Sequence, residues 1–139
     1  MVCREQATGF RSRQGDFDAA GARLAFVSTG GPHFARGFVE EFQLQGIPVL
    51  SDERRAAYRL LDFKRSGAST LLSPRAYAHY LRAIARGFLQ GRTQGDPFQQ
   101  GGVVVVRPDG EVAYLYRSRE GGDHPDIDEV LAALGRAAA

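Results

Sequence analysis

The residue best suited to chemistry in this sequence is Cys3, the only cysteine among 139 residues. Ala7 and Phe10 follow it at helical spacing and predict a weak helix over residues 3–14. A cysteine in the first turn of a helix faces unpaired N–H groups and the positive end of the helix dipole, and both favour the thiolate. Arg4 adds a neighbouring positive charge. The residues alone leave two interpretations open, a reactive thiol or a small buried side chain, the usual fate of a lone cysteine.

Other groupings of reactive side chains are weaker. His33, His79 and His124 lie in three separate segments and share no metal-ligand spacing, so we expect no metal site. The sequence contains no Walker loop, no G-x-G-x-x-G and no G-x-S-x-G. We therefore expect no bound cofactor.

Length and composition restrict the class of protein further. A chain of 139 residues suits a single domain with a core, and 43% hydrophobic with 24% charged residues is ordinary for a soluble globular protein. No apolar run approaches the ~20 residues that a membrane helix needs. One cysteine permits no internal disulfide, which fits a reducing cytoplasm. We expect a cytoplasmic protein with no membrane partner.

The basic residues are seventeen arginines and a single lysine, Lys64. An excess of arginine is typical of nucleic-acid binders, but such proteins cluster their basic residues on one face. Here the arginines are scattered among sixteen acidic residues, which leaves a net charge of +2. We attribute the arginine content to a GC-rich genome and expect no nucleic-acid partner.

The apolar patterns predict the order helix, strand, helix, strand, helix, helix, strand, strand, helix. Alternating helices and strands imply parallel pairing, and a closing hairpin adds an antiparallel pair, so the fold class is α/β with a mixed sheet flanked by helices. The hairpin is predicted over residues 102–117, with a turn at Pro108-Asp109-Gly110. The other expected strands lie at residues 23–29 and 47–50. One helix is expected after Pro32, with Phe34, Phe38 and Phe42 on one face, and another at 73–88, with Tyr77, Leu81, Ile84 and Phe88 at helical spacing. Two further helices are expected at 53–61 and after Asp126.

This order of elements resembles the thioredoxin fold, with Cys3 where the active-site cysteine opens the first helix. More specifically, the chain resembles the peroxiredoxin-like branch of the AhpC/TSA family, the group that includes prostamide/prostaglandin F synthase. The resemblance covers nearly the whole chain, residues 1–139, as one thioredoxin-like domain. Its motifs are Cys3-Arg4-Glu5-Gln6-Ala7, Gly21-Ala22-Arg23-Leu24-Ala25-Phe26-Val27, Gly95-Asp96-Pro97, Gln100-Gly101-Gly102 and Gly122-Asp123.

The resemblance implies thiol redox chemistry centred on Cys3. A Cys3 thiolate would attack a peroxide O–O bond and become a sulfenic acid. Arg4 is the candidate in sequence for stabilising the departing oxygen. The loop Gln100-Gly101-Gly102 corresponds to the loop that faces the active-site cysteine in thioredoxin folds, and with Thr29 it is the expected substrate-binding region. An ordinary strand-entry turn at the same glycines stays an open alternative.

Two departures from the family pattern matter. Thioredoxin folds place a strand before the cysteine, and two residues cannot form it. Cys3-Arg4 also looks like the second half of a C-x-x-C motif whose first cysteine is missing. We expect a domain that is incomplete at its N-terminus, with an exposed apolar slot beside the strand at residues 23–29 that can pair with another chain.

The first hypothesis is a cytoplasmic antioxidant oxidoreductase of peroxiredoxin-like type. It reduces peroxides or oxidised thiols through Cys3, and it depends on an external thiol reductant such as thioredoxin. The second hypothesis is a catalytically silent thioredoxin-like module that binds a protein partner, including a second copy, through its sheet edge.

Overall fold

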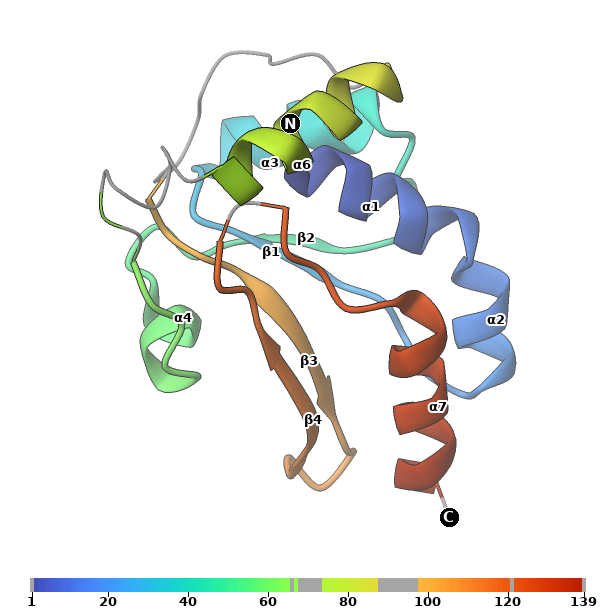
Figure 1. Ribbon diagram of the computed structural model, residues 1–139. Helices are drawn as coiled ribbons and strands as arrows, with labels where there is room; N and C mark the ends of the chain where they lie inside the picture. The colour runs from blue at the N-terminus through green and yellow to red at the C-terminus, as the bar shows by residue number, and fades with distance from the viewer. Residues whose placement is uncertain (1, 66, 68–73, 88–97, 121, 139) are drawn as a thin grey trace.

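Helices and strands alternate along the chain in the predicted α/β manner (Figure 1). A computed structural model describes residues 2–65, 67, 74–87, 98–120 and 122–138, with the side chains of residues 2, 3 and 76 outside the description. The elements in chain order are α1 (Val2–Ser12), α2 (Gln14–Ala19), β1 (Phe26–Ser28), α3 (Pro32–Glu41), β2 (Val49–Ser51), α4 (Ala56–Leu60), α6 (Pro74–Ala85), β3 (Gly102–Val106), β4 (Val112–Arg117) and α7 (Ile127–Ala138).

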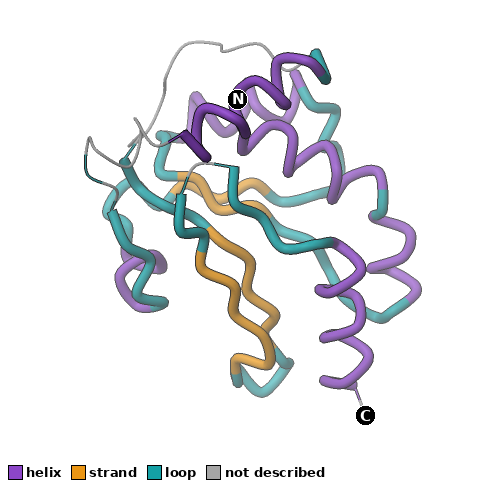
Figure 2. The backbone as a smooth tube through the Cα atoms, in the orientation of Figure 1, coloured by secondary structure: helices purple, strands orange, loops and turns teal. Residues whose placement is uncertain are grey.

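The four strands form two separate pairs. β1 and β2 are parallel, with Phe26 opposite Val49. β3 and β4 are the predicted antiparallel hairpin, with a bulge between Val105 and Val106. Figure 2 shows the two pairs running in different directions. The mixed α/β class is confirmed, but within the described residues the strands make two two-stranded sheets, not one mixed sheet. The strands predicted at residues 23–29 and 47–50 are also shorter than expected, at three residues each.

The edge of β1 that faces away from β2 is held by a side chain. The Phe26 amide donates to the Pro48 carbonyl and the Ser28 carbonyl accepts from the Asp52 amide, so the backbone groups of Val27 point to the other edge. There the Tyr58 hydroxyl donates to the Val27 carbonyl at 2.8 Å. A hydroxyl from the helical layer therefore stands where a neighbouring strand would bond.

The first helix is shorter than the predicted 3–14, and a second helix follows at once. α1 ends at Ser12 and α2 begins at Gln14. The predicted elements include no helix over residues 15–19, and Gly15, inside α2, is a poor helix former. α2 forms because Phe17 is buried and its ring stacks on Phe10, with ring centroids 5.5 Å apart.

One hydrophobic cluster joins elements from both sheets. Its buried members are Phe10 of α1, Phe17 of α2, Val105 of β3 and Val130 of α7. The partly buried residues packed against it come from β1, the hairpin, α7 and the segment before β1: Leu24, Phe26, Val103, Tyr114, Ile127, Leu131 and Leu134. The cluster therefore fixes α1, which carries Cys3, against the sheets.

The remaining helices begin where local chemistry favours them. Pro32 occupies the first turn of α3, as the sequence predicts. Both carboxylate oxygens of Asp52 accept backbone N–H groups, from Ala56 and Ala57, which caps α4 and starts it later than the expected 53–61. The Asp126 side chain accepts the Asp128 amide at the start of α7. Ser73 and Phe88, the ends of the helix predicted around α6, lie outside the described residues.

We expect replacement of Phe17 by alanine to destabilise the protein by about 3–5 kcal/mol, because it removes a fully buried ring and leaves a cavity. Leu60→Ala is the matched control, since Leu60 is 86% exposed and its loss should change stability by less than about 0.5 kcal/mol. Urea unfolding followed by circular dichroism measures both. Equal losses in the two variants would contradict the assignment of Phe17 to the core.

Candidate functional site

Cys3 lies in the first turn of α1, where the sequence places it. The turn is held against α3 by its neighbour Arg4. The Arg4 guanidinium pairs with the carboxylate of Glu41 and lies over the ring of Phe42, 5.4 Å from its centroid. Further along α1, Arg11 donates to the Gln43 carbonyl at 3.1 Å. Two arginines on α1 therefore fix it to the C-terminal end of α3.

Glu5, two residues after Cys3, ties the same turn to α6. Its carboxylate pairs with the guanidinium of Arg86, and Arg82 lies 3.9 Å away. The Glu5 side chain is only 11% exposed, whereas both arginines are about half exposed. This pairing balances an acidic charge close to Cys3 with two cations some 80 residues away in sequence, Arg82 in α6 and Arg86 just after it.

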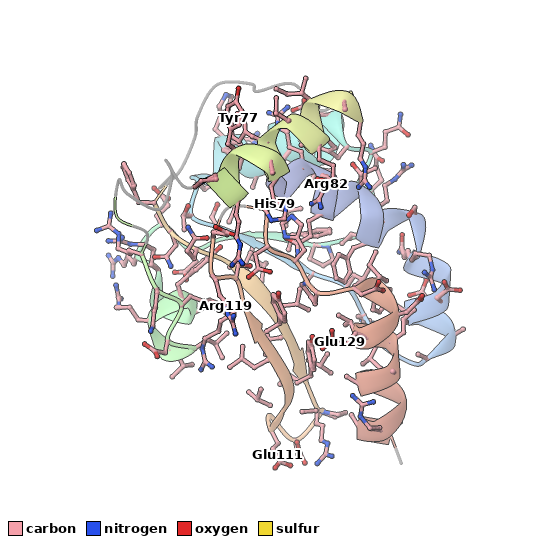
Figure 3. All side chains as sticks on the ribbon, in the orientation of Figure 1. Tyr77, His79, Arg82, Glu111, Arg119 and Glu129 are labelled. Carbon is pink, nitrogen blue, oxygen red and sulfur yellow. The ribbon has the colours of Figure 1, made fainter. Side chains whose placement is uncertain are left out.

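The inner side of α6 also reaches the end of the hairpin. His79 Nε2 lies 4.0 Å from a carboxylate oxygen of Glu120, just beyond β4. Figure 3 shows His79 and Arg82 on the side of α6 that faces α1 and the hairpin. Next to Glu120, the Ser118 amide donates to the Gly101 carbonyl at 3.0 Å. α6 thus spans the Cys3 turn and the strand ends beside the predicted loop.

The three residues of the predicted substrate loop have different surroundings. Gln100 is buried, and its backbone N–H donates to the Lys64 carbonyl at 3.0 Å. A Cβ on Gly101 would meet open space, whereas one on Gly102 would collide with the Tyr116 carbonyl and lie 2.7 Å from the Phe63 ring. Gly102 is therefore needed by the hairpin itself, as in a strand-entry turn. Gly101 has the open backbone that a substrate loop requires.

Thr29 and Arg4 are placed apart. Thr29 is partly buried and follows β1, just before the N-terminal end of α3. Arg4 is held at the opposite end of that helix by Glu41. A helix of 10 residues is about 15 Å long, so the structure does not bring these two predicted site residues together.

Two tyrosines of β4 form hydrogen bonds that shift ionisation. The Tyr116 hydroxyl donates to Asp123, which together with burial raises the pKa of Tyr116 to about 12. Burial and a bond to Glu129 raise the pKa of Tyr114 to about 12 as well. Burial would by itself raise the pKa of Asp123, but the bonds from Tyr116 and the Arg119 amide outweigh it and lower the pKa of that carboxyl. The loop after β4 is thereby capped by a carboxylate.

We expect Tyr116→Phe to lower stability by about 0.5–1.5 kcal/mol at neutral pH, the net contribution of one hydrogen bond. Because the folded pKa of Tyr116 lies above the ordinary value near 10, this stabilisation is full below about pH 10 and disappears toward pH 12. On the acid side it falls as Asp123 is protonated, since the folded pKa of that group is depressed. Unfolding at several pH values and a titration of phenolate absorbance measure the change.

Tyr77→Phe is the control for that variant, because Tyr77 is exposed on α6. It should leave stability unchanged. An unchanged number of late-ionising phenols in Tyr116→Phe would contradict the assignment.

The described residues contain no group of three or more His, Cys, Asp or Glu side chains that could hold a metal ion. Over the same residues, no helix is long and apolar enough to cross a bilayer.

These observations define a class of protein. It is an α/β chain of thioredoxin-like type, with a cysteine in the first turn of its first helix and a hairpin and a helix at its C-terminal end. The sequence profile of the AhpC/TSA antioxidant enzymes matches residues 9–120. The chain belongs to this family, as its motifs predict. The matched stretch begins six residues after Cys3. Membership indicates a thiol-dependent redox function.

Individual relatives agree with the family. Prostamide/prostaglandin F synthase of Bos taurus is 33% identical over 143 residues, which cover 97% of this chain and 68% of that protein. A chloroplastic thioredoxin-like protein of Arabidopsis thaliana is 29% identical over 96% of this chain and 56% of its own length. Peroxiredoxin-like 2C of Homo sapiens is 32% identical over 63% of this chain and 42% of its own. The chain thus matches only between 42% and 68% of the length of these relatives.

Sequence reasoning missed the charged groups that surround the Cys3 turn. Glu5 is only part of a motif in the sequence, and Arg82, Arg86 and Glu120 carry no pattern of their own. One signal was available: residues 63–95 contain six basic residues and no acidic one, so their partners must come from elsewhere in the chain.

Proposed function

We propose that this chain is a thiol-dependent oxidoreductase that reduces peroxides or oxidised thiols, with Cys3 as the reacting residue. The observation that carries the proposal is the position of Cys3 in the first turn of α1, in a chain of the AhpC/TSA family. Unpaired N–H groups and the helix dipole at that turn favour the thiolate. A thiolate is the nucleophilic form of cysteine.

The reaction divides into two steps. The Cys3 thiolate attacks one peroxide oxygen, the O–O bond breaks, and the other oxygen leaves as an alcohol or water after taking a proton, which leaves Cys3 as a sulfenic acid. An external thiol then condenses with the sulfenic acid, forming a mixed disulfide and releasing water. A second thiol attacks this disulfide and returns Cys3 to the reduced state.

The supporting residues have defined requirements. Arg4 stabilises the departing oxygen only if its guanidinium leaves Glu41, with which it is paired. In the proposed substrate region, the backbone at Gly101 is open to an approaching substrate, whereas the Gln100 side chain is buried beneath it. Thr29 and Gly102 complete the region assigned from the family resemblance.

Purified protein should consume hydrogen peroxide when dithiothreitol is supplied, and Cys3→Ser should abolish this turnover because the serine hydroxyl is not a comparable nucleophile. A peroxide-consumption assay measures it. Wild-type protein alkylated at its single thiol is the matched control and should lose activity to the same extent. Turnover that survives in Cys3→Ser would remove Cys3 from the reaction.

A second candidate function is a silent module that pairs with a partner through its sheet edge, the partner being a second copy of the chain. The observation that favours it is the outer edge of β1, where the Val27 carbonyl accepts a hydrogen bond from the Tyr58 hydroxyl and no strand pairs with it among the described residues. Val27 is 43% exposed, and exposed strand edges are sites of pairing between chains.

Val27→Pro tests this candidate, because proline removes the outward N–H of β1 while the bonds from Phe26 and Ser28 to the β2 side remain. If the edge pairs two copies, wild-type protein should dimerise with concentration in analytical ultracentrifugation and Val27→Pro should not. Val27→Thr keeps the N–H and should behave as wild type. A wild-type protein that stays monomeric throughout would eliminate pairing of two copies.

A further inference from the structure

The strand β2 has one edge that pairs with β1 and one edge that pairs with no strand among the described residues. The Pro48 carbonyl and the Asp52 amide both bond to β1. Because backbone groups alternate in direction along a strand, the N–H and C=O groups of Val49 and Ser51 point to the outer edge. Such a row of outward backbone groups is a template for a further strand.

An apolar groove lies along this outer edge, between β2 and α3. Its lining consists of the three residues of β2 and, from α3, Pro32, Ala35, Arg36 and Val39. Leu50, the middle residue of β2, is 54% exposed. Exposed apolar surface beside outward backbone groups favours a partner that adds a strand. We call the groove together with the outer edge of β2 the β2 edge groove.

Two exposed charges of opposite sign lie on α3 at this groove. Arg36 lines it, and Glu40 follows one helical turn later. Neither side chain forms an ion pair or a hydrogen bond in the described part of the chain, whereas the adjacent Glu41 pairs with Arg4. Within a helix, arginine four residues before glutamate interacts less favourably than the reverse order, and the helix dipole disfavours a carboxylate in the last turn. Both charges therefore call for a complement from outside α3.

A second copy of the chain provides the strand that the β2 edge groove lacks. Suppose that β2 pairs antiparallel with β2 of the second copy about a two-fold axis at Leu50. Val49 of each copy then stands opposite Ser51 of the other, and their outward groups form four hydrogen bonds. α3 connects the parallel strands β1 and β2 and runs in the opposite direction to both. The two α3 helices therefore lie antiparallel on either side of the axis.

The same axis passes α3 between its two exposed charges. Arg36 and Val39 line the groove beside β2, so this part of α3 is level with Leu50. Two-fold symmetry repeats every contact with the copies exchanged. Arg36 of each copy therefore lies against Glu40 of the other, and one pair of residue types supplies two ion pairs across the interface. The complementarity belongs to this chain alone, because the groove and its complement are the same surface.

We infer that the β2 edge groove is the interface of a homodimer, in which the two β1–β2 pairs join into one continuous sheet of four strands. The contact covers the exposed side of Leu50 and the groove beside Val39. It uses the edge of β2 and not the edge of β1 at Val27. The inference goes beyond the proposed function and does not depend on the chemistry of Cys3.

Charge reversal tests the contact between the two α3 helices. Wild-type protein should dimerise with concentration in analytical ultracentrifugation. Arg36→Glu and Glu40→Arg should each raise the dimer dissociation constant at least about tenfold, because both attractive contacts become repulsive. The double variant Arg36→Glu, Glu40→Arg should dimerise again. Arg136→Glu, at an exposed arginine in the last turn of α7, is the matched control and should dimerise like wild type. Circular dichroism checks that all variants fold.

A cross-link tests the position of the axis. Opposite residues of a non-hydrogen-bonded antiparallel pair have Cα atoms about 4.5 Å apart, a distance that a disulfide spans. In a Cys3→Ser background, Leu50→Cys places the single thiol of each copy on the axis. Leu60→Cys in the same background is the control, since Leu60 is more exposed, at 86%. Mild oxidation should link Leu50→Cys at least about tenfold faster, because association raises the effective concentration of the partner thiol. Non-reducing electrophoresis measures both rates.

Any of four results would overturn the inference. Wild-type protein stays monomeric throughout, which leaves the groove to a different protein; or the double charge variant stays as weak as the single variants. The dimer may also disappear in Val27→Pro and persist in Arg36→Glu, which assigns the contact to the edge of β1. Finally, the two thiol variants may cross-link at equal rates.

Discussion

The contact among Phe10, Phe17, Val105 and Val130 holds the described part of this fold together. No ladder of hydrogen bonds links the two pairs of strands in the residues described, so their relative position depends on side chains packed between them and the helices. Burial of a large apolar side chain contributes about 1.5–3 kcal/mol, more than the roughly 0.5–1.5 kcal/mol net of one backbone hydrogen bond. The same cluster fixes α1, and through α1 the position of Cys3.

Ion pairs link α1 to α3 and α6, two helices that contribute no residue to this cluster. Arg4 joins α1 to α3, and Glu5 joins α1 to α6. Adjacent residues on α1 thus make ion pairs to two different helices from the turn that contains Cys3. Exposed ion pairs each contribute little to stability, typically under about 1 kcal/mol. Their contribution here is to position: the Glu5 pairing places the side of α6 that carries Arg82 against the Cys3 turn.

The parts predictable from sequence are those decided locally. The hairpin at residues 102–117 follows from alternating valines and tyrosines around a Pro-Asp-Gly turn, and Pro32 marks the start of α3. The parts that failed depend on contacts between distant residues. α2 forms around Gly15 because Phe17 meets Phe10 and the core, and β1 shrinks to three residues where Tyr58 takes the place of a neighbouring strand.

The candidate site divides in the same way. Cys3 at a helix start was predictable, because helical spacing and position are local properties. The charged groups that surround its turn were not, because Glu5 and Arg86 are 81 residues apart and no local pattern indicates that they pair. The apolar spacing on α6 was visible in the sequence, but no local pattern could show that this side faces solvent.

The crowding at Gly102 has a genetic consequence. Phe63 and the Tyr116 carbonyl occupy the space beside its backbone, so the position has no room even for a methyl group. Every single-base change of a glycine codon that alters the residue introduces a larger one. Any amino-acid substitution at this codon therefore creates a steric clash, unless a change at Phe63 or a shift of β4 makes room beforehand. The neighbouring Gly101 codon, beside open space, is under no such steric constraint.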